Sequence, residues 1–333
     1  MISHALPSPP SLVVAEGLTK RFGETTALDK VSFAISPGEI IGYVGPNGAG
    51  KTTTMRILTG METAFGGDVR ISGMRQPLDR KSILGQISYL PQDVAFAPWR
   101  TAWETLWLFG RLSGISEAPL RQRIREVLQQ VGLSPKAETR VGTFSRGMKQ
   151  RLGLAQAMLN EPKLMILDEP FNHLDPGGRQ HVKGVLAELN RKGVAIIFSS
   201  HILADVEELM QRLLVIRNGR LIFDGTVDAL KAEHRDAEAV EIGFTGILPH
   251  ARLSALPGVA RLELMAPNVM RLHPVAGADL LAVATGLLGQ VIASGHGIRF
   301  VKPLVPSLEA IVGQMTGSPT EGAREQEEEG MAC

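Results

Sequence analysis

Unbroken apolar runs alternate with longer segments of helical character through the first two thirds of the chain. The runs EIIGYV (39–44), KLMILDEP (163–170) and GVAIIFSSH (193–201) lack polar alternation, which is typical of strands buried on both faces of a parallel sheet. Helical segments that alternate with such strands indicate an α/β fold. Residues 12 to about 224 are therefore predicted to form an α/β core.

Helical patterns dominate between residues 91 and 160, where the strand signals become sparse. The segments TAWETLWLFGRLSG (101–114) and PLRQRIREVLQQVG (119–132) each end at glycine, a common helix terminator. We therefore expect a helical insertion in the core over about residues 91–160.

The pattern changes again after a hairpin predicted at Asn218 and Gly219. A polar stretch, KAEHRDAEA (231–239), follows and places a domain boundary near Glu233. Beyond it, RLELMA (261–266) and VMRLHPV (269–275) have the character of short strands, with a helix expected around Leu280. The predicted organisation is a flexible leader (1–11), the core domain (12–233), a small α+β domain (234–317) and an acidic disordered tail (318–333).

Charge and composition then narrow the class of protein. The formal net charge of +1 gives no reason to expect a nucleic-acid partner, and the single cysteine, Cys333, excludes an internal disulfide. The first residues lack the charged region and apolar core of a secretory signal. The longest apolar stretch, Ala278–Ser294, contains Asp279 and falls short of the roughly 20 residues that span a bilayer. A cytoplasmic protein is expected, with this stretch packed as a helix that runs into a strand.

A glycine-rich segment follows the first buried run. Its sequence, GPNGAGKTTT (45–54), fits the template G-x-x-x-x-G-K-[ST] and lies between a predicted strand and a predicted helix. Backbone N–H groups and the positive end of the helix dipole would hold phosphate oxygens. Lys51 would reach the β- and γ-phosphates, and the Thr52 hydroxyl would bind Mg²⁺. A nucleoside triphosphate is the predicted ligand.

Two adjacent carboxylates end the buried run LMILDE. Asp168 and Glu169 lie at the carboxyl end of that strand, where nucleotides bind in open α/β sheets. Because side chains alternate along a strand, we assign Asp168 to the metal ion and Glu169 to the attacking water as general base. His201 ends the next run and is expected at the same edge. Ser145 precedes a periodic helix and is predicted to be its N-cap.

The ordered segments GPNGAGKTT, YLPQD, SRGMKQRL, LMILDEP, NHLD and SSH together closely resemble the nucleotide-binding subunits of ATP-binding-cassette (ABC) transporters over residues 12 to about 230. The resemblance implies a P-loop ATPase core with a helical signature subdomain, and ATP with Mg²⁺. It implies that Phe22 stacks on adenine, and that Gln92 senses the metal and couples to a membrane subunit. The other implied ATP-binding residues are Gly45, Pro46, Asn47, Gly48, Ala49, Gly50, Lys51, Thr52, Thr53, Ser145, Gly147 and Asp175, with Thr52, Gln92 and Asp168 at the metal.

The same resemblance implies a site completed by a second copy of the chain. Ser145 and Gly147 would contact the γ-phosphate held by the opposite subunit, Asp175 would bridge the two sites, and His201 would contact the γ-phosphate. A two-fold homodimer with ATP between the subunits places these groups together. Integral membrane permease subunits are the other expected partner, at the inner face of the cell membrane.

Three positions depart from the family pattern. Arg146 stands where the commonest signature has a glycine, although basic residues occur there in some exporter subfamilies. Phe171 and His173 replace a small polar residue and a glycine, which affects the expected signalling between subunits. The close of the second domain, VPSLEAIVGQMTG (305–317), resembles the C-terminal extension of drug-resistance-type ABC ATPases. An exporter motor is therefore favoured over a soluble translation or DNA-repair ABC ATPase, and over a kinase or GTPase.

Trp99, Trp103 and Trp107 recur every four residues and are predicted to share one helical face. Such a stripe is either packed core or an exposed aromatic patch that receives a partner helix. In ABC subunits this region receives a helix of the membrane subunit, and the pattern leaves both alternatives open.

Overall fold

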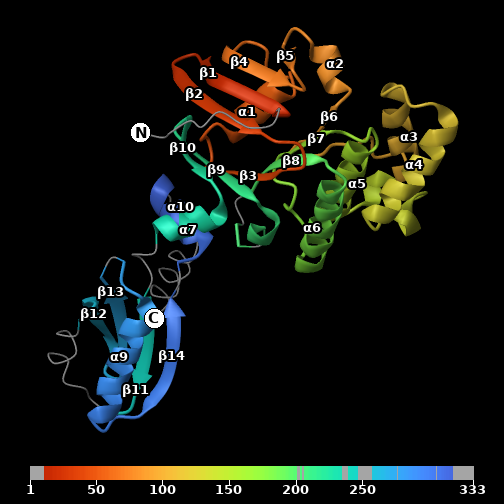
Figure 1. Ribbon diagram of the computed structural model, residues 1–333. Helices are drawn as coiled ribbons and strands as arrows, with labels where there is room; N and C mark the ends of the chain where they lie inside the picture. The colour runs from red at the N-terminus through yellow and green to blue at the C-terminus, as the bar shows by residue number, and fades with distance from the viewer. Residues whose placement is uncertain are drawn as a thin grey trace. The chain divides into compact units, whose positions relative to one another are not determined.

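The computed structural model describes residues 11–200, 203–204, 206–234, 239–246, 257–275, 277–304 and 306–317 (Figure 1). The predicted tail and residues 1–10 of the predicted leader lie outside these ranges. The chain divides into two compact units, residues 1–226 and 227–333. Each unit is described by itself.

A six-stranded sheet forms the centre of the first unit. Its order is β10-β9-β3-β8-β7-β6, and the five strands from β9 to β6 are parallel, which confirms the prediction from the apolar runs. The hairpin turn at Asn218 and Gly219 is also confirmed, with φ of 50° and 75°, as a type I′ turn requires. The strands are β3 (Ile40–Val44), β6 (Ile87–Leu90), β7 (Leu164–Leu167), β8 (Ala195–Ser199), β9 (Arg212–Arg217) and β10 (Arg220–Gly225).

A second, antiparallel sheet of this unit has the order β2-β1-β4-β5. Its strands are β1 (Val13–Phe22), β2 (Thr25–Ile35), β4 (Gly66–Ile71) and β5 (Met74–Gln76). One apolar core joins this sheet to α1 (Lys51–Leu58) and to the parallel strands. Met55, Ile57 and Leu58 of α1 are fully buried in that core, so the helix that follows the phosphate loop is anchored on its apolar side.

The remaining helices of the first unit gather mostly on one side of it (Figure 1). They are α2 (Arg80–Leu84), α3 (Ala102–Leu112), α4 (Glu117–Gln130), α5 (Arg146–Met158) and α6 (Pro176–Arg191), with single 3₁₀ turns at Ser134–Lys136, Val141–Thr143 and Glu207–Leu209. Helices α3, α4 and α5 pack on one another, as expected for the helical insertion. A capping box of Thr101 and Glu104 starts α3, with N···O distances of 2.9 and 3.1 Å.

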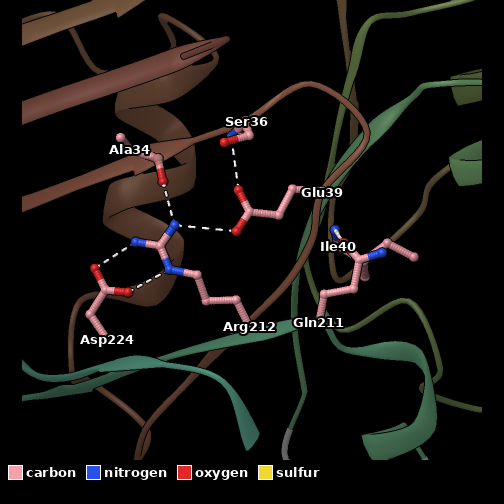
Figure 2. Close-up of polar contacts among 7 residues, drawn as sticks. All are labelled: Ala34, Ser36, Glu39, Ile40, Gln211, Arg212 and Asp224. Carbon is pink, nitrogen blue, oxygen red and sulfur yellow. Dashed lines mark hydrogen bonds and ion pairs between the residues drawn. The ribbon is translucent and has the colours of Figure 1, made fainter. Parts of the chain in front are cut away.

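A partly buried arginine joins the two sheets at the amino end of β3 (Figure 2). The Arg212 guanidinium on β9 donates to both carboxylate oxygens of Asp224 at 2.5 and 2.7 Å. It also donates to the Ala34 carbonyl at 3.0 Å and to Glu39 at 3.2 Å. Glu39 in turn accepts the Ser36 N–H at 2.8 Å. The cluster therefore links β9, β10, the end of β2 and the turn before β3.

Arg212→Ala is expected to lower the free energy of unfolding by about 1.5–3 kcal/mol, because charged hydrogen-bonding groups lose their partner. Lys192→Ala is the matched control, since Lys192 pairs with Glu188 on an exposed helix face and such pairs contribute roughly 0.5 kcal/mol or less. Urea unfolding of both variants measures the difference. Equal losses would show that the Arg212 cluster contributes no more than a surface ion pair.

The second unit is a small α+β domain, as predicted. Its antiparallel sheet has the order β12-β13-β11-β14. Helix α9 packs on one face of this sheet through Ala284, Leu287 and Val291, which confirms that the apolar stretch at 278–294 is a packed helix. The elements are α7 (Val227–Glu233), β11 (Ala239–Phe244), β12 (Val259–Ala266), β13 (Val269–Pro274), α9 (Leu280–Ala293), β14 (Ile298–Leu304) and α10 (Leu308–Thr316).

The other face of that sheet carries a row of charges of alternating sign. Lys302, Glu241, Arg271 and Glu263 are cross-strand neighbours on β14, β11, β13 and β12. Arg271 and Glu241 form an ion pair at 2.9 Å. Opposite charges on directly paired residues stabilise one strand register, and they are typical of a solvated face. Among the helices of the described ranges, none has the length and apolar character needed to cross a membrane.

Candidate nucleotide-binding and hydrolysis site

The predicted phosphate loop lies between β3 and α1, at the carboxyl end of the parallel strands. Gly50, the residue before α1, has φ of 112°, and a Cβ there would lie 2.6 Å from the Ala27 carbonyl oxygen, so only glycine fits. No side chain caps α1. The first N–H groups of the helix therefore lack a side-chain acceptor, which suits a bound anion.

Lys51 curls back over this loop. Its Nζ donates to the carbonyls of Gly45 at 2.5 Å and Pro46 at 3.1 Å, and the residue is buried. Burial lowers the pKa of Lys51, while the charges of Glu169 and Asp168 act in the opposite direction. The lysine and both carboxylates therefore share one electrostatic environment.

Asp168 is held between two hydroxyl groups. The Thr52 hydroxyl at the start of α1 donates to its Oδ2 at 2.9 Å, and the Ser199 hydroxyl at the end of β8 donates to its Oδ1 at 2.7 Å. Tyr89 of β6 lies near enough that Asp168 adds to the effect of burial in raising the pKa of Tyr89 to about 12. Three strands and α1 thus converge on one carboxylate.

Glu169 has an unusual backbone for a non-glycine residue, with φ of 51°. A left-handed conformation of this kind costs on the order of 1–3 kcal/mol and persists where neighbouring groups hold it. The Glu169 N–H donates to Ser199 Oγ at 2.8 Å, and the Gln150 side chain of α5 donates to the Glu169 carbonyl at 3.3 Å. Glu169 is consequently held on both sides by side chains from other elements.

Ser199 and Gln150 are the site residues that the sequence predictions missed. Each lies in a segment whose predicted site residues are others: His201 in FSSH, and Ser145 and Gly147 in SRGMKQ. A polar residue at the end of the otherwise apolar β8 was the available signal, because buried hydroxyl groups need a partner.

The hydroxyl of Thr52 and Oδ2 of Asp168 converge at 2.9 Å, beside the start of α1. These are hard oxygen ligands of the kind that Mg²⁺ prefers, and Mg²⁺ commonly takes only one or two protein ligands beside phosphate and water. The pair therefore fits the predicted metal. Within the described ranges, no cluster of three or more histidine, cysteine or acidic residues forms a separate metal site. Gln92 follows β6 and is exposed.

The start of α5 packs closely on the segment before α6. Ser145 is the N-cap of α5, as predicted, and accepts the Met148 N–H at 3.2 Å. A Cβ on Gly147 would lie 2.8 Å from the His173 carbonyl oxygen, so this approach requires glycine. Asp175 caps α6 by accepting the Gly178 N–H at 2.9 Å.

The unusual residues near Asp175 have local structural explanations. Phe171 is buried, with 2% of its surface exposed, and packs edge-on against Phe198 of β8 with ring centroids 5.6 Å apart. His173 has φ of 62°, a left-handed backbone conformation that glycine adopts without strain. Arg146 is exposed at the start of α5.

Phe22 lies at the end of β1 with 51% of its surface exposed. The Lys20 ammonium group is 4.7 Å from the centre of its ring, and this lysine is also paired with Glu62 at 2.9 Å. About half of the surface of Phe22 is therefore accessible to a ligand. His201 lies outside the described residues, so its place at the sheet edge stays a prediction.

The three tryptophans do not form one helical stripe. Trp99 precedes α3, which begins at Ala102, and 70% of its surface is exposed. Trp103 and Trp107 are half-buried, with guanidinium groups of α4 at 5.9 and 5.0 Å from their rings. The prediction of a shared helical face was wrong for Trp99, because the capping box starts the helix after it.

Comparison with known proteins places these features in context. The family model described as "ABC transporter" matches residues 28–172. The linearmycin resistance ATP-binding protein LnrL of Bacillus subtilis (strain 168) is 30% identical over 307 residues, 92% of this chain and 98% of the relative. The Nod factor export ATP-binding protein I of Rhizobium sp. (strain N33) is 34% identical over 308 residues, 92% and 97% of the two chains. A solved structure of an ATP-binding subunit of an ABC transporter is 31% identical, with a TM-score of 0.63 over 67% of this chain and 93% of that one.

Proposed function

Because this chain belongs to the ATP-binding subunits of the ABC transporter family and is an ATPase, we propose that it energises an export permease through an ATP-dependent dimer of two copies. The observation that carries the proposal is the convergence of Lys51, Thr52, Asp168 and Glu169 at the carboxyl end of the parallel sheet. A phosphate cradle, two oxygen ligands for a metal and a carboxylate base are the parts that ATP hydrolysis requires.

In the proposed reaction, the loop from Gly45 to Thr53 and Lys51 bind the phosphates. Thr52 and Asp168 would hold Mg²⁺, and Gln92 is proposed to sense the metal. The ion would neutralise charge on the β- and γ-phosphate oxygens. Glu169 removes a proton from the attacking water as general base. Phe22 orients adenine by stacking, and His201 is proposed to contact the γ-phosphate.

The second copy is proposed to complete each site. Ser145 at the start of α5 and Gly147 two residues further on would present a hydroxyl and N–H groups to the γ-phosphate held by the partner. Asp175 is the N-cap of α6. It is proposed to connect the two ATP sites of the dimer. The close packing of Gly147 on the His173 carbonyl supports this, since a shift of one segment would move the other.

Export is proposed from the two relatives that match both units of the chain. Their names state linearmycin resistance and Nod factor export, and each covers 92% of this chain. The match therefore includes the second unit, which resembles the extension of drug-resistance-type ATPases. These relatives favour a permease-bound motor at the inner face of the cell membrane over a soluble translation or repair ATPase. The proposed ATPase domain is residues 12–233, with its helical subdomain at about 91–160 and an accessory domain at 234–317.

Trp99→Glu is expected to weaken binding to the permease on the order of ten-fold, because an exposed aromatic anchor just ahead of α3 is removed. ATPase activity of the isolated subunit should stay unchanged, since Trp99 is largely exposed and is not one of the proposed ATP-binding or catalytic residues. Co-purification with a co-expressed candidate permease, together with phosphate release, measures both properties.

Leu112→Glu is the matched control, because Leu112 is 74% exposed at the far end of α3. It should leave permease binding intact. Equal binding by Trp99→Glu and the unchanged protein would contradict the docking role of this surface. Absence of any co-purified permease with the unchanged protein would contradict the proposed function itself.

A further inference from the structure

Ser199 ends β8 with its side chain fully buried, and it contacts both residues of the Asp168–Glu169 pair. We propose that Ser199 is a positioning residue for ATP hydrolysis, which sets the orientation of the general base by holding the Glu169 backbone to the Asp168 carboxylate. The inference rests on the proposed function, because it requires Glu169 to act on the attacking water.

The direction of both hydrogen bonds follows from the groups involved. A serine hydroxyl has one proton to donate and lone pairs to accept with, whereas an ionised carboxylate only accepts. Ser199 therefore donates to Asp168 Oδ1 at 2.7 Å and accepts the Glu169 N–H at 2.8 Å. With 0% of its surface exposed, Ser199 is out of reach of the solvent that could substitute for its hydroxyl.

The second step concerns the conformation of Glu169. Its φ of 51° turns the chain sharply where β7 ends at Leu167, and this turn determines the direction in which the glutamate side chain leaves the strand. Ser199 holds the N–H of this residue and Gln150 holds its carbonyl. Loss of the Ser199 hydroxyl leaves the N–H without this acceptor and frees the backbone to relax.

A small relaxation is enough to slow the reaction, because misplacing a reacting group by about 1 Å costs on the order of 100-fold in rate. The nucleotide would still bind, since the phosphate loop, Lys51 and Thr52 belong to other elements. Ser199→Ala is therefore expected to lower kcat on the order of 10- to 100-fold, with KM for ATP unchanged. Ser199→Thr retains a hydroxyl on a strand residue and should restore most of the turnover.

The test uses the full chain and compares Ser199→Ala, Ser199→Thr and Ser88→Ala by steady-state phosphate release, ATP binding and urea unfolding. Ser88 lies buried on β6 of the same sheet and serves as the control for loss of a buried hydroxyl. It should leave kcat unchanged. Ser199→Ala should have little further effect on the residual hydrolysis of Glu169→Gln, because both changes act through one group.

Several results would overturn the inference. One is that Ser199→Ala has the same kcat as Ser88→Ala, in an assay where Glu169→Gln has lost hydrolysis and Glu169 is thereby shown to act as the base. Others are a loss in ATP binding instead of turnover, failure of Ser199→Thr to recover activity, and additive losses in the double variant. Wild-type turnover in Glu169→Gln would instead overturn the assignment of the general base, and this inference with it.

Discussion

Glu169→Gln is expected to bind ATP, to stall hydrolysis and to accumulate as a dimer. The amide keeps the size of the carboxylate and the backbone contacts to Ser199 and Gln150, but it cannot take a proton from water. Loss of a general base typically costs about 10²–10⁴ in rate. Lys51, Thr52 and the phosphate loop are unchanged, so ATP still joins the two copies and is consumed too slowly to release them.

Size-exclusion chromatography with and without ATP, beside a phosphate-release assay, measures both parts of this expectation. Glu188→Gln is the matched control, since Glu188 is half exposed on α6 and pairs with Lys192. It should hydrolyse ATP at the rate of the unchanged chain. Normal turnover in Glu169→Gln would remove that residue from the base role. A variant that binds ATP fully and stays monomeric would contradict the shared site.

Lys51→Ala is expected to fail one step earlier, at ATP binding. Removing one member of a desolvated, hydrogen-bonded charge pair costs about 2–5 kcal/mol, which is on the order of 30-fold or more in affinity. Lys51 is buried, and its ammonium group is the cation of the phosphate loop that lies in the field of Asp168 and Glu169. The variant should therefore remain monomeric at ATP concentrations that dimerise Glu169→Gln.

Lys51→Met distinguishes loss of charge from loss of packing, because it keeps most of the aliphatic stem. It should bind ATP as poorly as Lys51→Ala, while urea unfolding shows both variants folded. Fluorescence titration with an ATP analogue gives the affinities. Tight ATP binding by either folded variant would exclude Lys51 as the phosphate ligand. The pair of substitutions thus separates binding at Lys51 from chemistry at Glu169.

The structural reasons for the family departures were accessible only in part from the sequence. The replacements at Phe171 and His173 were visible, but their consequences depend on packing. Phe171 fills the core against Phe198, a residue 27 positions later in the numbering of the chain. His173 offers its carbonyl to the close approach of Gly147. Neither contact has a local sequence signature, since each joins segments that meet only after the sheet has formed.

By itself, the sequence determined the features that depend on neighbouring residues. Unbroken apolar runs predicted the parallel strands, Asn218 and Gly219 predicted the hairpin, and Ser145 predicted a helix cap. The glycine spacing of segment 45–54 likewise predicted a phosphate loop. In each case the spacing along the chain sets the local geometry, because backbone dihedrals and side-chain periodicity are properties of adjacent positions.

Only the tertiary structure decided how the chemistry is held in place. Thr52 and Asp168 meet across 116 positions, and Ser199 reaches Asp168 across 31 and Glu169 across 30. The tertiary structure also decided which tryptophans are exposed. Trp99 lies before the start of α3 and is exposed, whereas arginines of α4 lie over the rings of Trp103 and Trp107. Such contacts depend on the order of strands in the sheet and on the burial of whole elements. Local spacing carries no information on distances between segments that the fold brings together.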